Sequence, residues 1–263
     1  MARSITPTPA MRQHLLSLLR KELPAGPPAT RRALFRRGLI THDGSLTQDG
    51  WRTAVACERL VDQCKHLKIR YEHLAGLRPG QRPEYEAWRH YTGLGYSGCH
   101  CEGGAILLLI RAASLDALTR LNSFNSREDA CTRCTEAQMV IHADRFAEIR
   151  SAIEIAGSSH VADAFDEIYG YDIVREYYPN IQRDAFLALF EAIGSFRLAM
   201  IADVIMTAPY TYRKGWPDLT MTRAGEVLWV EVKTTDKLHA SQIVTITRMR
   251  RVLPGEIHVV QLQ

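Results

Sequence analysis

The sequence contains no long hydrophobic segment, and it has few cysteines for its length. Its longest uninterrupted apolar run near the middle of the chain is AILLLI, whereas a membrane span needs roughly 18 apolar residues. The initial stretch MARSITPTPAMRQHLL lacks the continuous apolar core of a secretory signal. Six cysteines among 263 residues, without such a signal, favour free thiols over a disulfide scaffold. These absences predict a protein of the reduced cytoplasmic compartment that has no membrane partner.

The composition is that of a folded protein with an uneven distribution of charge. Hydrophobic residues make up 46% of the chain and charged residues 24%, which suits one or two domains with a sizeable core. The net charge is +4, but the first 50 residues carry eight Lys or Arg against three Asp or Glu. A basic region joined to a nearly neutral remainder indicates either a nucleic-acid partner or an ordinary solvated basic surface.

The basic region shows the pattern of a small helical domain. Residues 10–23 have helical apolar spacing, and a second helix over TRRALFRRGL is expected to stop at its glycine. The Asp43-Gly44 pair predicts a tight turn between two short extended pieces. Thr47 is then expected to cap a long helix over residues 48–66. The predicted order is therefore helix, helix, small hairpin, helix.

That order resembles part of a winged-helix domain, in which an arginine-rich helix often precedes the sequence RGLI, a turn and LT. On this interpretation, residues 1–70 form a DNA-binding region. Its second helix would contact DNA phosphates through Arg31, Arg32, Arg36 and Arg37. A helical hairpin with a solvated arginine face remains the alternative.

The rest of the chain changes character after Pro209. Residues 77–101 are expected to form loops, residues 103–121 a strongly apolar helix, and residues 135–200 several helices. Beyond Pro209, PDLTMT and EVLWVEVK read as strands, SQIVTITRMRRV as a helix and EIHVVQLQ as a last strand. The expected fold is α/β, with a helical N-terminal region followed by a small mixed sheet flanked by helices.

The strand EVLWVEVK carries two charged residues in an apolar setting. Because strand side chains alternate, Glu231 and Lys233 share one face with Trp229. Asp218 stands near the start of the preceding strand, so pairing of the two strands would bring its carboxylate close to Glu231. Two such carboxylates repel unless a cation lies between them, and Mg²⁺ prefers oxygen ligands. The alternative is a half-exposed strand face on which Glu231 and Lys233 are simply polar.

Two groups of motifs resemble one nuclease family. GWPDLTM, WVEVK and KLHASQ resemble the VRR-NUC branch of the PD-(D/E)xK nucleases, which typically shows G-x-P-D, E-V-K and a glutamine at the start of the next helix. Upstream, YSGCHCEGGAILLLIRAASLDAL resembles the stretch of Fanconi-associated nucleases in which Gly-Glu-Gly precedes an apolar helix. Cys101 stands where that motif usually has glycine. The resemblance covers residues 90–263 and is loose between these motifs.

The resemblance implies a restriction-endonuclease-like (PD-(D/E)xK) core over residues 185–263, inside a catalytic region that spans residues 85–263. It also implies a bound Mg²⁺ or Mn²⁺, with the ligands Glu102, Asp218, Glu231 and the carbonyl of Val232. A carboxylate before a buried apolar helix needs compensation, which a helix N-terminus and a metal would both supply. Glu102 as a merely favourable N-terminal charge is the alternative.

By the same resemblance, Lys233 would activate or position the attacking water, and Gln242 would support the lysine or the scissile phosphate. Arg213 and Lys214 would contact the DNA backbone. The implied activity is hydrolysis of phosphodiester bonds in branched or 5′-flap DNA, in repair or in the processing of replication intermediates.

Two other functions remain open at this point. Fanconi-associated nucleases carry further DNA-binding and helical-repeat regions that help to select the flap, and this sequence shows only the short basic piece. A Holliday-junction resolvase of the VRR-NUC type, acting as a homodimer, is therefore one alternative. A non-catalytic DNA-binding protein is the other, although all four charged residues of the implied site are present, namely Glu102, Asp218, Glu231 and Lys233.

The cysteines offer a weaker indication of a metal. Cys99-x-Cys101 and Cys131-x-x-Cys134 have spacings that zinc sites use. A long apolar helix separates the two pairs, and the first pair flanks the implied catalytic glutamate. We therefore expect no structural zinc.

Overall fold

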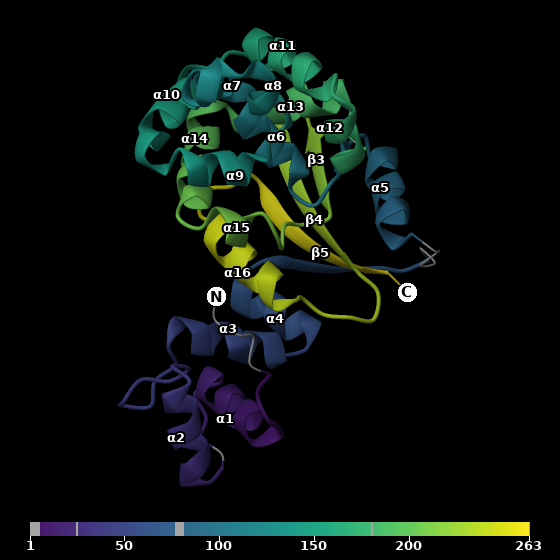
Figure 1. Ribbon diagram of the computed structural model, residues 1–263. Helices are drawn as coiled ribbons and strands as arrows, with labels where there is room; N and C mark the ends of the chain where they lie inside the picture. Colours follow the sequence, from purple (N-terminus) through teal and green to yellow (C-terminus); the bar gives the residue numbers. More distant parts are fainter. Residues whose placement is uncertain (1–5, 25, 77–81, 180, 263) are drawn as a thin grey trace. The chain divides into compact units, whose positions relative to one another are not determined.

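The computed structural model describes residues 6–24, 26–76, 82–179 and 181–262 (Figure 1). The chain divides into two compact units. The first comprises Met1–Lys68 and Asp236–Val244, and the second comprises Ile69–Thr235 and Thr245–Gln263. The first unit is therefore built from two separate stretches of sequence.

The first unit is helical. Its helices before residue 69 are α1 (Pro9–Leu19), α2 (Pro28–Arg36), α3 (Gln48–Cys57) and α4 (Leu60–Leu67). Leu15, Leu34 and Ile40 are buried together in its core. An isolated antiparallel bridge joins Ile40 to Leu46, and Thr47 Oγ1 caps α3 by accepting a hydrogen bond from Gly50 N at 3.0 Å. The predicted order of helix, helix, hairpin and helix is confirmed.

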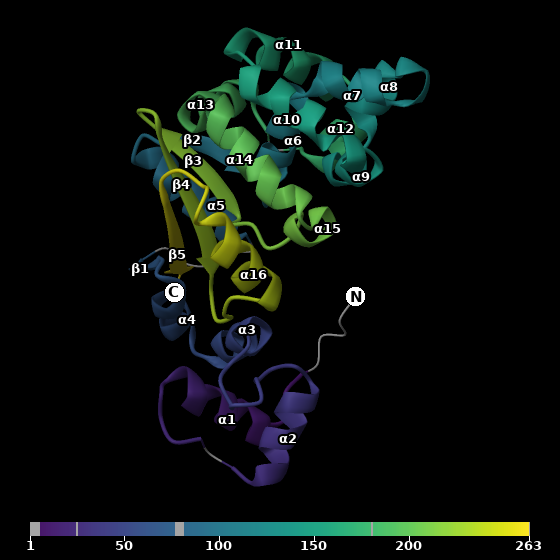
Figure 2. The same cartoon turned by 90° about the vertical axis from the view of Figure 1, so that its left-hand side faces the viewer.

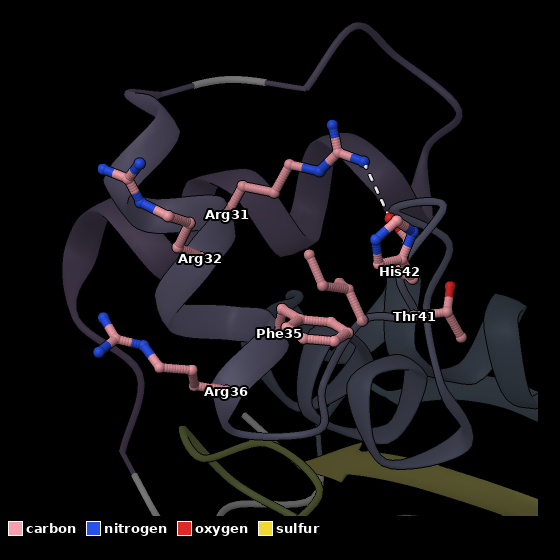
Figure 3. Close-up of a pocket in the computed structure, with 7 residues that line it drawn as sticks. Arg31, Arg32, Phe35, Arg36, Thr41 and His42 are labelled. Carbon is pink, nitrogen blue, oxygen red and sulfur yellow. Dashed lines mark hydrogen bonds between the residues drawn. The ribbon is translucent and has the colours of Figure 1, made fainter.

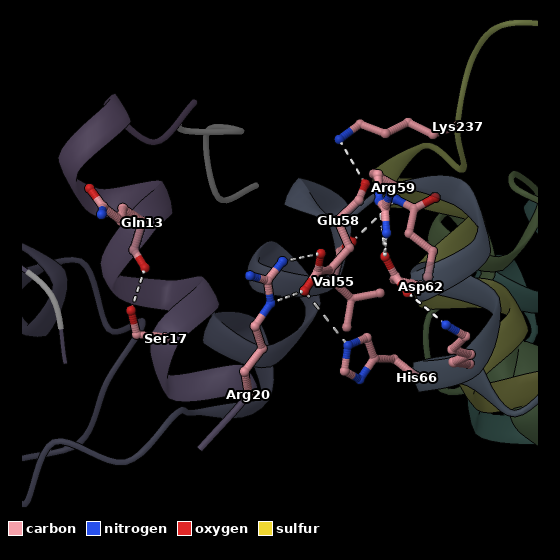
Figure 4. Close-up of polar contacts among 11 residues, drawn as sticks. Gln13, Ser17, Arg20, Val55, Glu58, Arg59, Asp62, His66 and Lys237 are labelled. Carbon is pink, nitrogen blue, oxygen red and sulfur yellow. Dashed lines mark hydrogen bonds and ion pairs between the residues drawn. The ribbon is translucent and has the colours of Figure 1, made fainter. Parts of the chain in front are cut away.

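The predicted single helix over residues 48–66 is wrong, because the chain becomes extended at Glu58. The Glu58 carboxylate is buried and accepts hydrogen bonds from Arg20 Nε at 2.9 Å and Nη2 at 2.8 Å (Figure 4). A buried carboxylate is tolerated only when it is paired. The Glu58 carbonyl, which a continuous helix would bond internally, accepts from Lys237 Nζ at 3.0 Å instead. Tertiary contacts therefore end the helix at this residue.

The segment Asp236–Val244 belongs to the first unit through hydrogen bonds to α4. The Gln63 side chain bonds the backbone of Leu238 in both directions, donating to its oxygen at 3.3 Å and accepting from its nitrogen at 2.9 Å. Gln63 is fully buried, so both bonds are shielded from water. The helix α16 (Ala240–Met249) begins inside this segment.

The second unit contains a five-stranded mixed sheet with the order β1-β5-β4-β3-β2 (Figure 1). The parallel strands are β1 (Arg70–Leu74), β5 (Glu256–Leu262) and β4 (Glu226–Lys233). The antiparallel strands are β3 (Leu219–Arg223) and β2 (Ser97–His100). The small mixed sheet expected from the sequence is confirmed, and β1 is a strand that the sequence analysis did not predict.

Each face of the sheet has its own cover. Helix α5 (Pro83–Gly93) packs Ala87 and Tyr91 against Leu228, Val230 and neighbouring apolar side chains of one face. The other face carries the alternate residues of β4, and helix α13 (Arg183–Ile193) packs against β2, β3 and β4. Figure 2 shows the helices between β2 and β3 gathered on one side of the sheet. The predicted alternation of faces along β4 is confirmed.

A helical block connects β2 to β3. Its helices are α6 (Gly104–Ala113), α7 (Leu115–Leu121), α8 (Arg127–Thr132), α9 (Thr135–Ile141), α10 (Phe146–Ile155), α11 (Ser158–Tyr169), α12 (Asp172–Tyr177), α13, α14 (Ser195–Met206) and α15 (Pro209–Tyr212). Short 3₁₀ turns lie at Ser123–Asn125 and Ala143–Arg145. All of α6 is buried, as its composition predicted, although the helix breaks at Ser114.

None of the described helices is by itself long and apolar enough to cross a membrane, while α13 and α14 meet these criteria only together, bent by 91°.

The stretch predicted as loops contains α5 and β2, so that prediction is wrong; residues 77–81 lie outside the described residues. The local sequence supports a helix start, since Pro83 occupies the first turn together with Glu84 and Glu86. Ala87 and Tyr91, four residues apart, form its buried stripe. The prediction of loops followed the many turn residues on either side of α5 instead of this short periodic pattern.

Candidate active site

The β3–β4 hairpin places Asp218 beside Glu231. Leu219 is opposite Val230 in the antiparallel register, so the preceding Asp218 lies across from Glu231. The Asp218 Oδ2 atom accepts a hydrogen bond from Val232 N at 2.8 Å. A two-residue turn, Ala224-Gly225, has φ values of 51° and 82° and fixes this register. The strand register therefore places the two acids opposite each other, as the sequence predicts, and their binding of a metal stays a prediction.

Glu231 and Lys233 form an ion pair inside the protein. Lys233 Nζ lies 2.7 Å from Glu231 Oε1, and the side chains are 6% and 0% exposed. The half-exposed strand face considered as an alternative is therefore excluded. A buried pair of this kind costs desolvation energy, and replacement by apolar residues is often neutral or stabilising. The pair is consequently weak evidence for stability.

The electrostatics of the site centre on Asp218. Burial raises the pKa of Asp218 to about 6, while the Val232 N–H and the Lys233 ammonium act in the opposite direction. The carboxylates of Glu84 and Glu102 raise the pKa further. Two further acids therefore disfavour the charged form of Asp218, and a cation there would offset their effect.

Glu102 reaches this region through a strained turn after β2. Cys101 N donates to the Asp218 carbonyl at 3.3 Å, which extends the β2–β3 pairing as far as Cys101, the residue before Glu102. Glu102 and Gly103 both have left-handed backbones, with φ of 43° and 83°. A Cβ atom on Gly103 would lie 2.2 Å from the Trp216 ring, so only glycine fits. Glu102 itself is exposed, and α6 begins after Gly103 rather than at the glutamate.

Cys101, which replaces the glycine of the family motif, takes part in local hydrogen bonding. Its Sγ atom accepts from Ala105 N at 3.3 Å. A hydrogen bond with Cys99 raises the pKa of the Cys101 thiol and lowers that of Cys99. Cys131 instead donates to Glu167 Oε1 at 3.7 Å, and burial raises the pKa of its thiol to about 12. All six cysteines are free thiols.

The donor set suits a hard divalent cation. Carboxylate oxygens and a backbone carbonyl are the ligands that Mg²⁺ and Mn²⁺ accept, and Mg²⁺ usually keeps several of its waters. Across the described residues, no three His, Cys, Asp or Glu side chains are gathered closely enough to enclose a metal ion. A site on Asp218 and Glu231 would therefore depend on water and the Val232 carbonyl for its remaining ligands.

Gln242 lies in the other unit. Its Oε1 atom accepts from His239 N at 2.8 Å, at the start of α16, and its side chain is largely buried. The sequence suggested that it supports Lys233, and that role stays a prediction.

The basic residues predicted to contact DNA differ in whether they already form an ion pair within the protein. Arg213 Nη1 is 3.1 Å from the carboxylate of buried Glu136, while the next residue, Lys214, is exposed. The four arginines predicted for the second helix of the chain lie on α2 and at its end, and all are exposed. Arg37 differs from the others because its guanidinium contacts the Met11 sulfur at 3.0 Å.

Glu84 is the residue that the sequence analysis missed. It lies in the first turn of α5, and its carboxylate contributes to raising the pKa of Asp218. The signal was present as a proline followed by two glutamates, at a helix start that was read as a loop.

No protein-family model matches the chain, and no curated protein sequence matches it. Two solved structures have a similar fold. One is paFAN1 bound to gapped DNA with a one-nucleotide 5′ flap, with a TM-score of 0.57 and 15% sequence identity over 89% of this chain. The other is paFAN1 bound to gapped DNA with a two-nucleotide 5′ flap, with a TM-score of 0.52 and 16% identity over 94%. This chain spans 46% and 51% of their lengths, and its fold is thus similar to about half of paFAN1.

Proposed function

We propose that this chain is a metal-dependent, structure-specific DNA nuclease that hydrolyses phosphodiester bonds in branched or 5′-flap DNA during repair or the processing of replication intermediates. The observation that carries the proposal is the hairpin on which Asp218 lies across from Glu231, with the Lys233 ammonium 2.7 Å from the Glu231 carboxylate. The similarity in fold to paFAN1 bound to flap DNA supports the same class of substrate.

Mg²⁺ or Mn²⁺ would be held by the carboxylates of Asp218 and Glu231 together with the Val232 carbonyl and water, and Glu102 would complete the site through a bound water. When bound, such an ion supplies positive charge for the phosphate and lowers the pKa of water. Burial, and after it the carboxylates of Glu84 and Glu102, raise the pKa of Asp218, and a bound cation would favour its charged form.

The protein groups would position the reactants. Glu231 holds the Lys233 ammonium in place, and this ammonium would orient the attacking water and offset the charge of the phosphate. In the reaction, the water oxygen forms a bond to phosphorus, and one phosphorus–oxygen bond of the backbone breaks. The leaving oxygen takes up a proton, and the chain end carries the phosphate.

The first test is cleavage of end-labelled 5′-flap, Holliday-junction and linear duplex DNA with Mg²⁺ or Mn²⁺. Asp218→Asn and Lys233→Met keep side-chain volume better than alanine, and circular dichroism would check that both fold. We expect the wild type to cut and both variants to lose at least 100-fold in rate, a loss typical of removing a catalytic group.

Glu226→Gln is the matched control, because Glu226 is the exposed first residue of the same strand. Its rate should equal that of the wild type. Preference for a four-way junction over a flap would indicate a resolvase. Binding of DNA without cleavage in either metal would leave a non-catalytic DNA-binding protein and would contradict the proposal.

A further inference from the structure

A pocket of about 650 Å³ lies on the first unit, at the exposed side of α2. It is lined by Arg31, Arg32, Phe35, Arg36, Ile40, Thr41 and His42 (Figure 3). All of these residues come from one short stretch, so the pocket needs no other part of the chain. Its size lies within the range of 300–1,000 Å³ that small-ligand pockets occupy.

The walls of the pocket are strongly cationic. Arg32 and Arg36 are four residues apart on α2 and extend to the same side (Figure 3). Within the part of the chain that the structure describes, neither guanidinium has an ion pair or a hydrogen bond. Arg31 is anchored at the opposite wall, where Nη2 donates to the His42 carbonyl at 3.3 Å. The nearest acid in sequence is Asp43, and hydrogen bonds from Thr41 and Ser45 lower the pKa of its carboxyl.

The floor of the pocket is aromatic. Phe35 is 48% exposed, whereas its neighbour Leu34 is fully buried in the core of the unit. The Phe35 ring meets the His42 ring edge to face, with 6.1 Å between the centroids. Phe35 therefore keeps about half of its surface exposed in the pocket and is not part of the core.

We propose that this pocket binds one unpaired nucleotide of a single-stranded DNA segment, with the base stacked on Phe35 and the adjoining phosphates on Arg32 and Arg36. Arginines alone would bind the phosphates of any nucleic acid. A base inside a duplex is already stacked on its neighbours, so it cannot stack on the Phe35 ring. The assignment deepens the proposed function, because it makes the single-stranded part of a branched substrate a contact of the first unit.

The test measures binding by the full chain in EDTA, so that it does not depend on cleavage. Fluorescence anisotropy would compare a labelled oligo(dT) strand with a duplex of the same length. Phe35→Leu removes the π face but keeps an apolar side chain. We expect it to weaken single-strand binding about tenfold, as the loss of one base–aromatic stack does, and to change duplex binding less than twofold.

Two further variants keep the result interpretable. Phe196→Leu is the matched control, because Phe196 is an exposed phenylalanine of α14, at 61%, in the other unit, and it should leave both affinities unchanged. The double variant Arg32→Gln/Arg36→Gln should weaken both ligands and reduce the salt slope for single strands by about 1.4.

The inference is overturned if Phe35→Leu leaves single-strand binding unchanged, or weakens strand and duplex equally. These outcomes do not depend on the proposed function. If the wild type cuts flaps but Phe35→Leu does not change its affinity for single strands, the nuclease proposal stands and the pocket proposal fails. If the wild type cuts nothing but Phe35→Leu weakens single-strand binding, the nuclease proposal fails and the pocket proposal stands.

Discussion

Glu231 and Lys233 meet where water is excluded, so each charge helps to compensate the burial of the other. We expect Glu231→Gln and Lys233→Met each to lower the free energy of unfolding by about 3–5 kcal/mol, because each leaves the other charge buried without its counterion. The double variant should lose clearly less than the sum of the two. Urea titration of the four proteins measures this, and simple additivity would contradict the pairing.

The burial of Asp218 makes the stability of the protein depend on pH in the direction opposite to that caused by most carboxylates. Its pKa is raised to about 6 by burial, above the ordinary value of 3.8. The native state therefore holds a proton that the unfolded chain has already released between these values, and stability falls as pH rises through that window. Without metal, Asp218→Asn should stabilise the protein by about 2 kcal/mol at pH 8 and have little effect near pH 3.5.

Thermal or urea unfolding in EDTA at both pH values measures this difference. An equal effect of Asp218→Asn at pH 8 and pH 3.5 would show that the carboxylate is not desolvated. Added Mg²⁺ should remove the advantage of the variant at pH 8, because only the carboxylate can bind the ion.

Among single residues, the sequence predicted those positions that depend only on the alternation of side chains along a strand and on strand pairing within a hairpin. Asp218 beside Glu231, and Glu231 on the face of Lys233, follow from a period of two and a two-residue turn. Glu84 could not be placed, because its approach to Asp218 depends on how α5 packs across the sheet. Nothing local in the sequence encodes that distance.

At the scale of elements, the turn between β2 and α6 depends on Gly103. We expect Gly103→Ala to destabilise the protein by about 2 kcal/mol or more, because φ is positive and the added Cβ would clash with Trp216. Gly93→Ala is the matched control, since that glycine ends α5 with open space around it. The control should be neutral or stabilising by up to about 1 kcal/mol. Equal effects in urea titrations would contradict the packing of this turn.

Two of the errors in predicting elements share one cause. The helix expected over residues 48–66 ends early because the buried Glu58 pairs with Arg20, which is 38 residues away. Strand β1 was missed because it is a short edge strand whose side chains are mostly partly exposed. In both cases the deciding contact lies far away in sequence, whereas α6, with its strong local apolar pattern, was predicted correctly.

At the scale of the whole molecule, the segment Asp236–Val244 depends on residues near the other end of the sequence. Gln63 bonds the backbone of Leu238, and Lys237 bonds the Glu58 carbonyl. We expect a chain that begins at residue 69 to retain its sheet but to release this segment, and trypsin should then cut after Lys237 at least ten times faster than in the full chain.

Mass spectrometry of the digest identifies that cut. Gln63→Leu in the full chain should accelerate it in the same direction while leaving both units folded. A cutting rate that is unchanged in the shortened chain would mean that the segment is held by the second unit alone.

The polypeptide passes from one unit to the other three times, after residues 68, 235 and 244. Recombination at a single point in the gene therefore could not exchange one unit and leave the other intact. A gene fragment that carried only the sheet would also carry the nine residues 236–244, of which Lys237 and Leu238 would lack their partners Glu58 and Gln63. We therefore expect the two parts to be inherited together. A substitution on α4 is expected to be accompanied by a compensating substitution just beyond β4.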